Sequence, residues 1–267
     1  MKKRTIAAIL AIALACLAAS SCLSTLESAA SAAGIGQKAP VVTNEEAVSA
    51  LRDALTEGIM SASAQLAAKD GYFGDSLLKI LLPAEAKPML DSVGKIPQGQ
   101  RLIDDVVLRL NRCAEEAAKD VTPIFADAIA SMTITDGVAI VRGGQRSATE
   151  YLSSKTRPRL FGLYRPKIDA ALSKPLVMDV SAKKSWETLS AAYNKAGAIA
   201  NPAARLAGRK EPMPPVNVDL ADYATDKALD GLFSKIGDEE GKIRRNPLGY
   251  ASAMIKKVFG ALKDGRL

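Results

Sequence analysis

The sequence contains no histidine among its 267 residues. Histidine is the commonest general base in enzymes and the commonest protein ligand for metals. Its absence leaves carboxylates, lysine, tyrosine or serine for any catalysis. The pair Ser153 and Ser154 lacks the Gly-x-Ser-x-Gly setting of a serine hydrolase, and no loop has the alternating oxygen ligands of a calcium site. We therefore expect no metal and no cofactor, and an enzyme is not the leading interpretation.

Cysteine is scarce, with Cys16, Cys22 and Cys113 in the whole chain. If an N-terminal signal is removed and Cys22 carries lipid, Cys113 alone is left in the fold, and no intramolecular disulfide can form. In an oxidising compartment the fold must then be stabilised by its own core, which about 225 residues can supply.

The N-terminus has the layout of a secretory signal, with Lys2, Lys3 and Arg4 before an apolar run over residues 6–19. That run is shorter than the roughly 20 apolar residues of a membrane-spanning helix. The following Ala-Ser-Ser-Cys sequence ends at Cys22 and resembles the bacterial lipobox, although Ala19 stands where leucine is usual. The alternative is ordinary cleavage with an incidental cysteine.

These features predict a lipoprotein signal peptide over residues 1–21 and a lipidated flexible tether over 22–42, rich in Ser, Ala and Gly. Two acyl chains give stable membrane anchoring, whereas one chain does not. Leu23, rather than Asp, follows the cysteine. By resemblance to the known sorting rule, this favours the periplasmic face of the outer membrane.

After the N-terminal signal, the positive charge of the chain is a mild excess spread over many residues. The net charge of +7 includes Lys2, Lys3 and Arg4; without them 33 basic residues face 29 acidic ones, a net +4. Nucleic-acid binding requires a clustered basic stripe with aromatic side chains, so we expect no nucleic-acid partner. A mild positive excess is better suited to anionic lipid headgroups.

No pair of alternating apolar runs predicts a hairpin, whereas apolar residues recur at helical spacing through the chain. The sequence therefore predicts a single all-α, bundle-like domain over residues 43–267 with little or no sheet, and a long loop near 201–218. Capping boxes are expected to start helices at Thr43/Glu46, Thr133/Asp136 and Ser147/Glu150. The last of these helices is expected to end near Lys155, and Thr156 to cap a new one.

Several blocks of the chain, in order, resemble the bacterial domain-of-unknown-function family 4197 (DUF4197). They include "LRDALTEGIMSASAQLAAKDGYFGD", "DDVVLRLNRCAEEAAK", "FADAIASMTITDGVAIVRGG" and "YATDKALDGLFSKIGDEEGKIRRNP". The insertion around Lys210 is particular to this chain. The resemblance implies a helical domain located in the envelope and implies no activity.

A candidate anion site lies in "RGGQRSATEYLSSKT", where Gly143 and Gly144 separate two predicted helices. Amides at a helix N-terminus attract anions, and arginine binds phosphate through paired hydrogen bonds. The predicted ligand residues are Arg142, Arg146, Thr149 and Tyr151, with Arg157 and Arg159 close by. The simpler interpretation is a Gly-Gly turn without a ligand.

A predicted polar network comprises Asn111, Glu115, Asp230, Glu240 and Arg244. Asn111 and Glu115 share a helical face. They either bind a ligand or satisfy backbone ends and a neighbouring arginine. Carboxylates such as Glu115 and Asp230 would serve the alternative function, an enzyme acting on envelope material. A deep cleft collecting Glu115, Asp230 and Arg146 would favour that enzyme.

The leading hypothesis is a non-enzymatic envelope lipoprotein, held at the membrane by its lipid anchor. Its helical domain would bind an envelope protein partner or an apolar or anionic lipid ligand. An apolar groove or a flat apolar patch would favour this function.

Overall fold

The computed structural model describes residues 42–95, 99–177 and 180–266. The chain divides into two units, Met1–Thr43 and Asn44–Leu267, and the helices and strands described below lie in the second. The predicted signal peptide, nearly all of the tether, and Cys22 lie outside the described residues.

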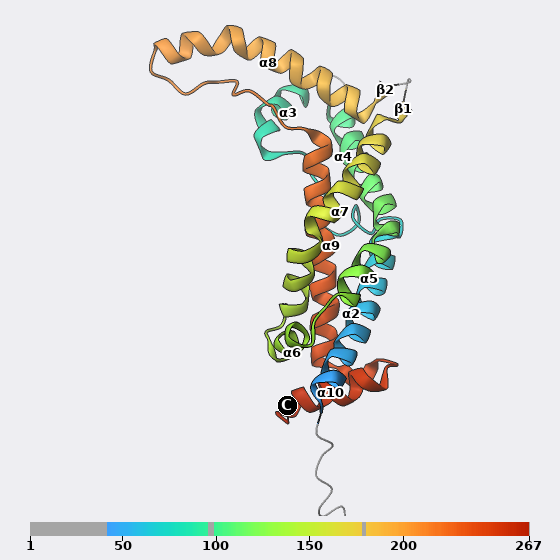
Figure 1. The fold of residues 1–267 in the computed structure, drawn as a ribbon. Coiled ribbons are helices and arrows are strands. Elements are labelled where there is room, and N and C mark those ends of the chain that lie inside the picture. Colours follow the sequence, from blue (N-terminus) through green and yellow to red (C-terminus); the bar gives the residue numbers. More distant parts are fainter. Residues whose placement is uncertain (1–41, 96–98, 178–179, 267) are drawn as a thin grey trace, which may run out of the picture. The chain divides into compact units, whose positions relative to one another are not determined.

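The second unit is built of helices, which confirms the predicted all-α class (Figure 1). Two short strands, β1 (Pro175–Val177) and β2 (Val180–Ser181), pair antiparallel with Pro175 opposite Ser181. In chain order the helices are α2 (Asn44–Ala67), η1 (Ala84–Ala86), α3 (Lys87–Val93), α4 (Gly99–Ala117), η2 (Ala118–Asp120), α5 (Thr122–Ala130), α6 (Ile134–Arg142), α7 (Ser147–Ser173), α8 (Ala182–Leu206), α9 (Leu220–Arg245), η3 (Pro247–Gly249) and α10 (Ala253–Lys263).

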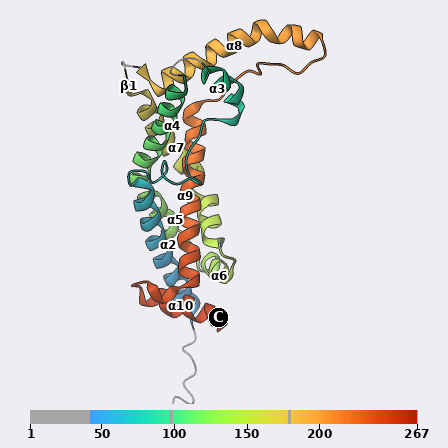
Figure 2. The ribbon, with the colours of Figure 1, turned by 180° about the vertical axis from the view of Figure 1, so that it is seen from behind.

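Helix α9 lies at the centre of the packing and contacts α7, α2, α4 and α10, as Figures 1 and 2 show from opposite sides. It can do so because its buried residues surround much of the helix rather than one narrow stripe. Phe125 of α5 meets Phe233 of α9 edge to face, with ring centroids 5.9 Å apart, a favoured aromatic geometry. Tyr72 packs so closely on α9 that a Cβ at Gly231 would lie 2.6 Å from its ring.

Local chemistry determines where α9 begins and ends. The side chain of Asp219 accepts hydrogen bonds from the amides of Ala221 and Asp222 at 2.8 and 3.0 Å, which satisfies two donors that have no partner inside the helix. The last turn carries Lys242, Arg244 and Arg245, whose positive charge is favourable at the negative end of the helix dipole.

Of the predicted capping boxes, the one at Thr133 is confirmed: its hydroxyl accepts from the Asp136 amide at 3.1 Å. The box at Ser147 is wrong, because Ser147 is already helical and its predecessor has no capping side chain. The predicted break before Thr156 is also wrong. The Thr156 hydroxyl donates to the Leu152 carbonyl one turn earlier, and a single helix α7 continues.

Helix α7 stays continuous although Pro158 and Pro166 lie inside it, and each proline removes one backbone hydrogen bond. The physical reason is burial. Residues four apart form an unbroken buried row along the helix: Leu152, Thr156, Leu160, Tyr164, Ile168 and Leu172. This row lies on the side of α7 that packs against α9 and α4, and tertiary packing outweighs the local disruption.

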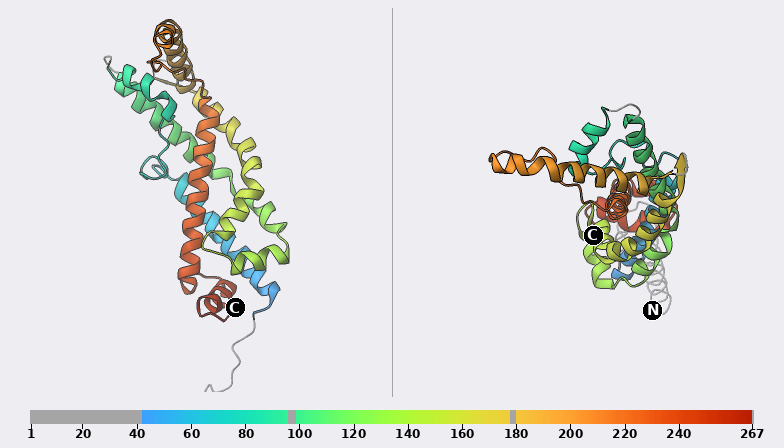
Figure 3. Two further views of the ribbon diagram at one scale, coloured as in Figure 1. Left: turned by 90° about the vertical axis from the view of Figure 1, so that its left-hand side faces the viewer. Right: turned by 90° about the horizontal axis from the view of Figure 1, so that it is seen from above.

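The long loop begins later than predicted. Helix α8 continues to Leu206, through the predicted loop start at Asn201. Beyond its first turns α8 points away from the other helices, and an extended segment returns beside it (Figure 3). The side-chain amides of Asn194 and Asn201 donate to the Val216 and Met213 carbonyls of this segment, at 2.9 and 2.7 Å. These bonds hold α8 and the segment together where the sequence is rich in Pro and Ala.

Among the described residues, no single helix is long and apolar enough to cross a membrane. Helices α5 and α6 satisfy the length and composition criteria only as a pair, bent by 107° at their junction.

Candidate functional site

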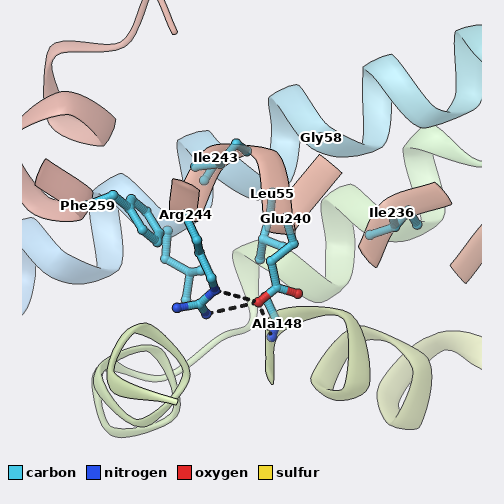
Figure 4. A pocket seen from close by; sticks show the side chains of 10 residues that line it. Leu55, Gly58, Ala148, Ile236, Glu240, Ile243, Arg244 and Phe259 are labelled. Carbon is cyan, nitrogen blue, oxygen red and sulfur yellow. Dashed lines mark hydrogen bonds and ion pairs between the residues drawn. The ribbon is translucent and has the colours of Figure 1, made fainter. Parts of the chain in front are cut away.

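Glu240 and Arg244, two members of the predicted polar network, form a buried ion pair on α9 with N–O distances of 2.9 Å. The Glu240 carboxylate also accepts the amides of Ala148 and Thr149, at 3.1 and 2.9 Å, and the Thr149 hydroxyl at 2.7 Å. It thus caps the N-terminus of α7, the role that the sequence assigned to Ser147 (Figure 4).

Arg244 satisfies the opposite helix end. Its guanidinium donates to the carbonyls of Val141 and Ile140 at 3.1 and 2.9 Å, which are among the last carbonyls of α6. One ion pair on α9 therefore ties the end of α6 to the start of α7. The adjoining cavity, lined by Leu51, Ile236 and Phe259 among others, has a volume of about 20 Å³, enough for roughly one water molecule. Both charges of this pair are therefore engaged in holding helix ends.

Asn111 and Glu115 fasten the loop that follows α2 onto α4. The fully buried Asn111 amide donates to the carbonyls of Ile80 and Val107 and accepts the Ile80 amide, each at 2.8 Å. Glu115 accepts the amides of Tyr72 and Phe73, both at 3.2 Å, and pairs with Arg112 at 2.5 Å. Of the two interpretations of this pair, the structure favours the one in which they satisfy backbone ends and an arginine.

Asp230 lies on the outside of α9, half exposed, and pairs with Arg157 at 2.8 Å. Arg157 also pairs with Asp226 at 3.1 Å. Glu115, Asp230 and Arg146 therefore have separate neighbours and do not gather in one cleft. The alternative of a carboxylate-dependent enzyme gains no support from their arrangement.

The residues predicted to bind an anion after the Gly143–Gly144 turn face different surroundings. The Thr149 hydroxyl donates its hydrogen bond to the Glu240 carboxylate. Tyr151 has the Lys155 ammonium 5.7 Å from its ring centroid, and burial together with the nearby Asp136 raises the pKa of its phenol. Arg142 is exposed at the end of α6. Arg159 pairs with Asp127 at 2.8 Å.

Arg146 extends toward α9, where its guanidinium donates to the Phe233 carbonyl at 3.1 Å. It lies directly over the backbone at Gly237, since a Cβ there would be 2.4 Å from the guanidinium carbon. One turn further, a Cβ at Gly241 would be 3.0 Å from the guanidinium of Arg245. Two arginines thus occupy the space that the two missing side chains leave on α9.

These residues line a cleft of about 370 Å³, hereafter the cationic cleft, made by α9 with contributions from α2 and the α6–α7 turn. It is lined by Gln65, Gln145, Arg146, Lys235, Gly237, Asp238, Gly241, Lys242 and Arg245. Four cationic side chains face one carboxylate in this set. Lys235 pairs with Asp75 at 3.0 Å and Lys242 with Glu239 at 2.6 Å. Within the described ranges Arg245 makes no ion pair.

Of the four cations in the cleft, Arg146 was predicted from the sequence, whereas Lys235, Lys242 and Arg245 were not. A signal was present in "KIGDEEGKIRR" (Lys235–Arg245), where glycines four apart share one helical face with basic residues beside them. Glycine is unfavourable inside a helix by roughly 1 kcal/mol relative to alanine. Two such glycines therefore indicate a place where another group must approach the backbone closely.

Cys113 is a core residue. It is buried on α4, and burial raises the pKa of its thiol to about 11, so it is protonated at neutral pH. Among the described residues no group of three or more acidic or cysteine side chains is arranged to hold a metal ion.

The family model described as "Protein of unknown function (DUF4197)" matches residues 41–260. The chain therefore belongs to the DUF4197 family, as its sequence blocks predict. No curated protein and no solved structure matches the chain.

Proposed function

We propose that this protein is a lipid-anchored binding protein of the bacterial envelope. Its helical domain binds an anionic, phosphate-bearing headgroup of a lipid in the cationic cleft. The observation that carries the proposal is the pair of arginines, Arg146 and Arg245, resting on two glycines of α9 beside Lys235 and Lys242.

The chemistry of the cleft suits phosphate. Guanidinium groups present paired donors that match phosphate oxygens, and ammonium groups add compact positive charge. Arg146 and Arg245 are both exposed, so a ligand reaches them without unfolding any element. Each basic side chain near an anionic membrane surface contributes about 1 kcal/mol to association.

The anchor is supported by the sequence, in which a basic start and a short apolar run precede Cys22. Replacing Cys22 by serine should abolish metabolic labelling with palmitate and release the chain from the membrane fraction, because the acylated thiol is lost. Fractionation of cells expressing each form would measure this. Labelling that persists in the Cys22→Ser chain would point to Cys16 and contradict the assignment.

The cleft is tested with the full-length Cys22→Ser chain and vesicles of phosphatidylcholine with or without phosphatidylglycerol, by co-sedimentation at low salt. Arg146→Ala with Arg245→Ala should weaken binding to the anionic vesicles roughly thirtyfold, which corresponds to about 1 kcal/mol for each charge. The matched control is Lys195→Ala with Lys256→Ala, which removes the same charge from exposed sites outside the cleft.

A second variant changes the geometry of the cationic cleft and leaves its charge unchanged. Gly237→Ala with Gly241→Ala keeps every cation but displaces both guanidinium groups. It should weaken binding while thermal stability stays the same or rises, since alanine favours helix by roughly 1 kcal/mol per site. The control is Gly162→Ala with Gly260→Ala, where no atom lies within 4 Å of the new Cβ. Equal binding by both glycine variants, or no binding by the parent, would refute the proposal.

A further inference from the structure

Two exposed leucines lie in residues 72–81, hereafter the leucine loop, which follow α2. Leu77 is 92% exposed and Leu81 is 59% exposed, whereas Ile80 between them in sequence is buried. Single apolar side chains are common on protein surfaces. What these two leucines can do therefore depends on how the loop is held and on which groups lie beside it.

Hydrogen bonds hold the leucine loop in place. Glu115 and Asn111 fasten its two ends to α4 through backbone groups of the loop. Between these ends, the carbonyl of Asp75 accepts the amide of Lys79 at 2.8 Å, which closes a single helix-like turn. Leu77 lies inside this turn, so its exposed position belongs to a hydrogen-bonded conformation.

One carboxylate joins this turn to the cationic cleft. Asp75 accepts the Leu77 amide through one oxygen and the Lys235 ammonium through the other, both at 3.0 Å. Lys235 lines the cleft, and Gly231, one turn earlier on α9, packs against Tyr72. Residues four apart share a helix face, so the leucine loop and the cleft lie next to each other on one face of α9.

We propose that the leucine loop inserts into an anionic bilayer when the cationic cleft holds phosphate headgroups of that bilayer. This insertion presupposes the function proposed above, and it specifies that the ligand is a lipid in its membrane rather than an extracted lipid or free phosphate. A headgroup that stays in its bilayer brings the membrane surface to the mouth of the cleft. Leu77, which shares Asp75 with a lysine of the cleft, then lies at that surface.

The charges around the loop favour a membrane surface as its partner. The four cations of the cleft attract anionic headgroups, and leucines that enter the boundary between headgroups and acyl chains leave water. Asp75 is the only acidic residue among 72–81, and its charge is paired with Lys235. The loop also has its own cation, because the Lys79 ammonium lies 4.0 Å from the ring centroid of Phe73.

An environment-sensitive dye reports the insertion directly. In the full-length chain with Cys16→Ser and Cys22→Ser, Leu77→Cys is labelled with nitrobenzoxadiazole, while the buried, protonated Cys113 thiol stays unlabelled. Vesicles of phosphatidylcholine and phosphatidylglycerol should shift the dye emission to shorter wavelength, and doxyl groups on the acyl chains should quench it. The control carries the dye at Leu206→Cys, a leucine 91% exposed on α8 and outside the cleft, and should show neither change.

Removing the leucines tests their share of the binding. Leu77→Ser with Leu81→Ser should weaken co-sedimentation with the anionic vesicles roughly tenfold, because two apolar side chains no longer leave water on binding. Circular dichroism and thermal unfolding should match the parent, since both side chains are exposed in the folded chain. The matched control is Ile199→Ser with Leu206→Ser, which removes two exposed apolar side chains from α8 and should leave binding unchanged.

The outcomes separate the insertion from the proposed function. If the parent binds anionic vesicles through Arg146 and Arg245 while a dye at position 77 keeps its aqueous emission, the proposed function stands and the insertion is wrong. An equal shift at positions 77 and 206 would show contact without a preferred face and would also overturn the insertion. A parent that binds no anionic vesicles would contradict both.

Discussion

Replacing Glu240 by alanine should lower the free energy of unfolding by about 3–5 kcal/mol, because removing one partner of a buried ion pair leaves the other charge uncompensated. The loss has two sources here. Arg244 keeps its bonds to α6 but loses its carboxylate, and the amides of Ala148 and Thr149 lose their acceptor. Urea unfolding followed by circular dichroism would measure the change.

The control for this change is Glu116→Ala. Glu116 also pairs with a cation on a neighbouring helical turn, Lys119, but its side chain is 70% exposed. Exposed pairs contribute about 0–1 kcal/mol. Replacing Glu240 and Arg244 together by apolar residues of similar size should recover part of the loss, because no buried charge is then left unpaired. A Glu240→Ala protein as stable as the Glu116→Ala protein would contradict the capping role.

Replacing Asn111 by alanine should cost about 3 kcal/mol. The change leaves both the amide and the carbonyl of Ile80 buried without a partner, and each such group costs roughly 1–3 kcal/mol. The loop after α2 should also become more sensitive to proteolysis, since Asn111 is one of its attachments to α4. Thermal unfolding and limited proteolysis would measure the two effects.

Gln100→Ala provides the comparison for Asn111, because it removes a side-chain amide from the same helix. The Gln100 amide donates to Asp104 at 2.9 Å on the exposed surface, where water replaces the lost bond. Its effect should stay within about 0.5 kcal/mol. If Asn111→Ala destabilised the protein no more than Gln100→Ala, the buried bonds to Ile80 would not be significant for stability.

The helical class, the family and much of the helix pattern followed from the sequence alone, because they depend on neighbours a few residues apart. The Thr133 cap is an example, since its acceptor and donor lie three residues apart. The apolar spacing within α2, α4 and α9 likewise depends only on the period of the helix. Arg146 could be singled out as a candidate anion ligand because it follows a Gly-Gly turn.

Tertiary structure decided every feature that joins distant residues. The cap of α7 comes from Glu240, 91 residues from Thr149, so local chemistry at Ser147 gave the wrong donor and the wrong acceptor. The continuity of α7 through two prolines depends on burial against α9 and α4, which no local propensity encodes. The length of α8 depends on the hydrogen bonds that Asn194 and Asn201 make to Val216 and Met213 in the extended segment beside it. The cationic cleft exists because Arg146 reaches the backbone of α9 at Gly237. The glycines of α9 indicate a close approach there, but the sequence does not identify Arg146, far away in the chain, as the group that approaches.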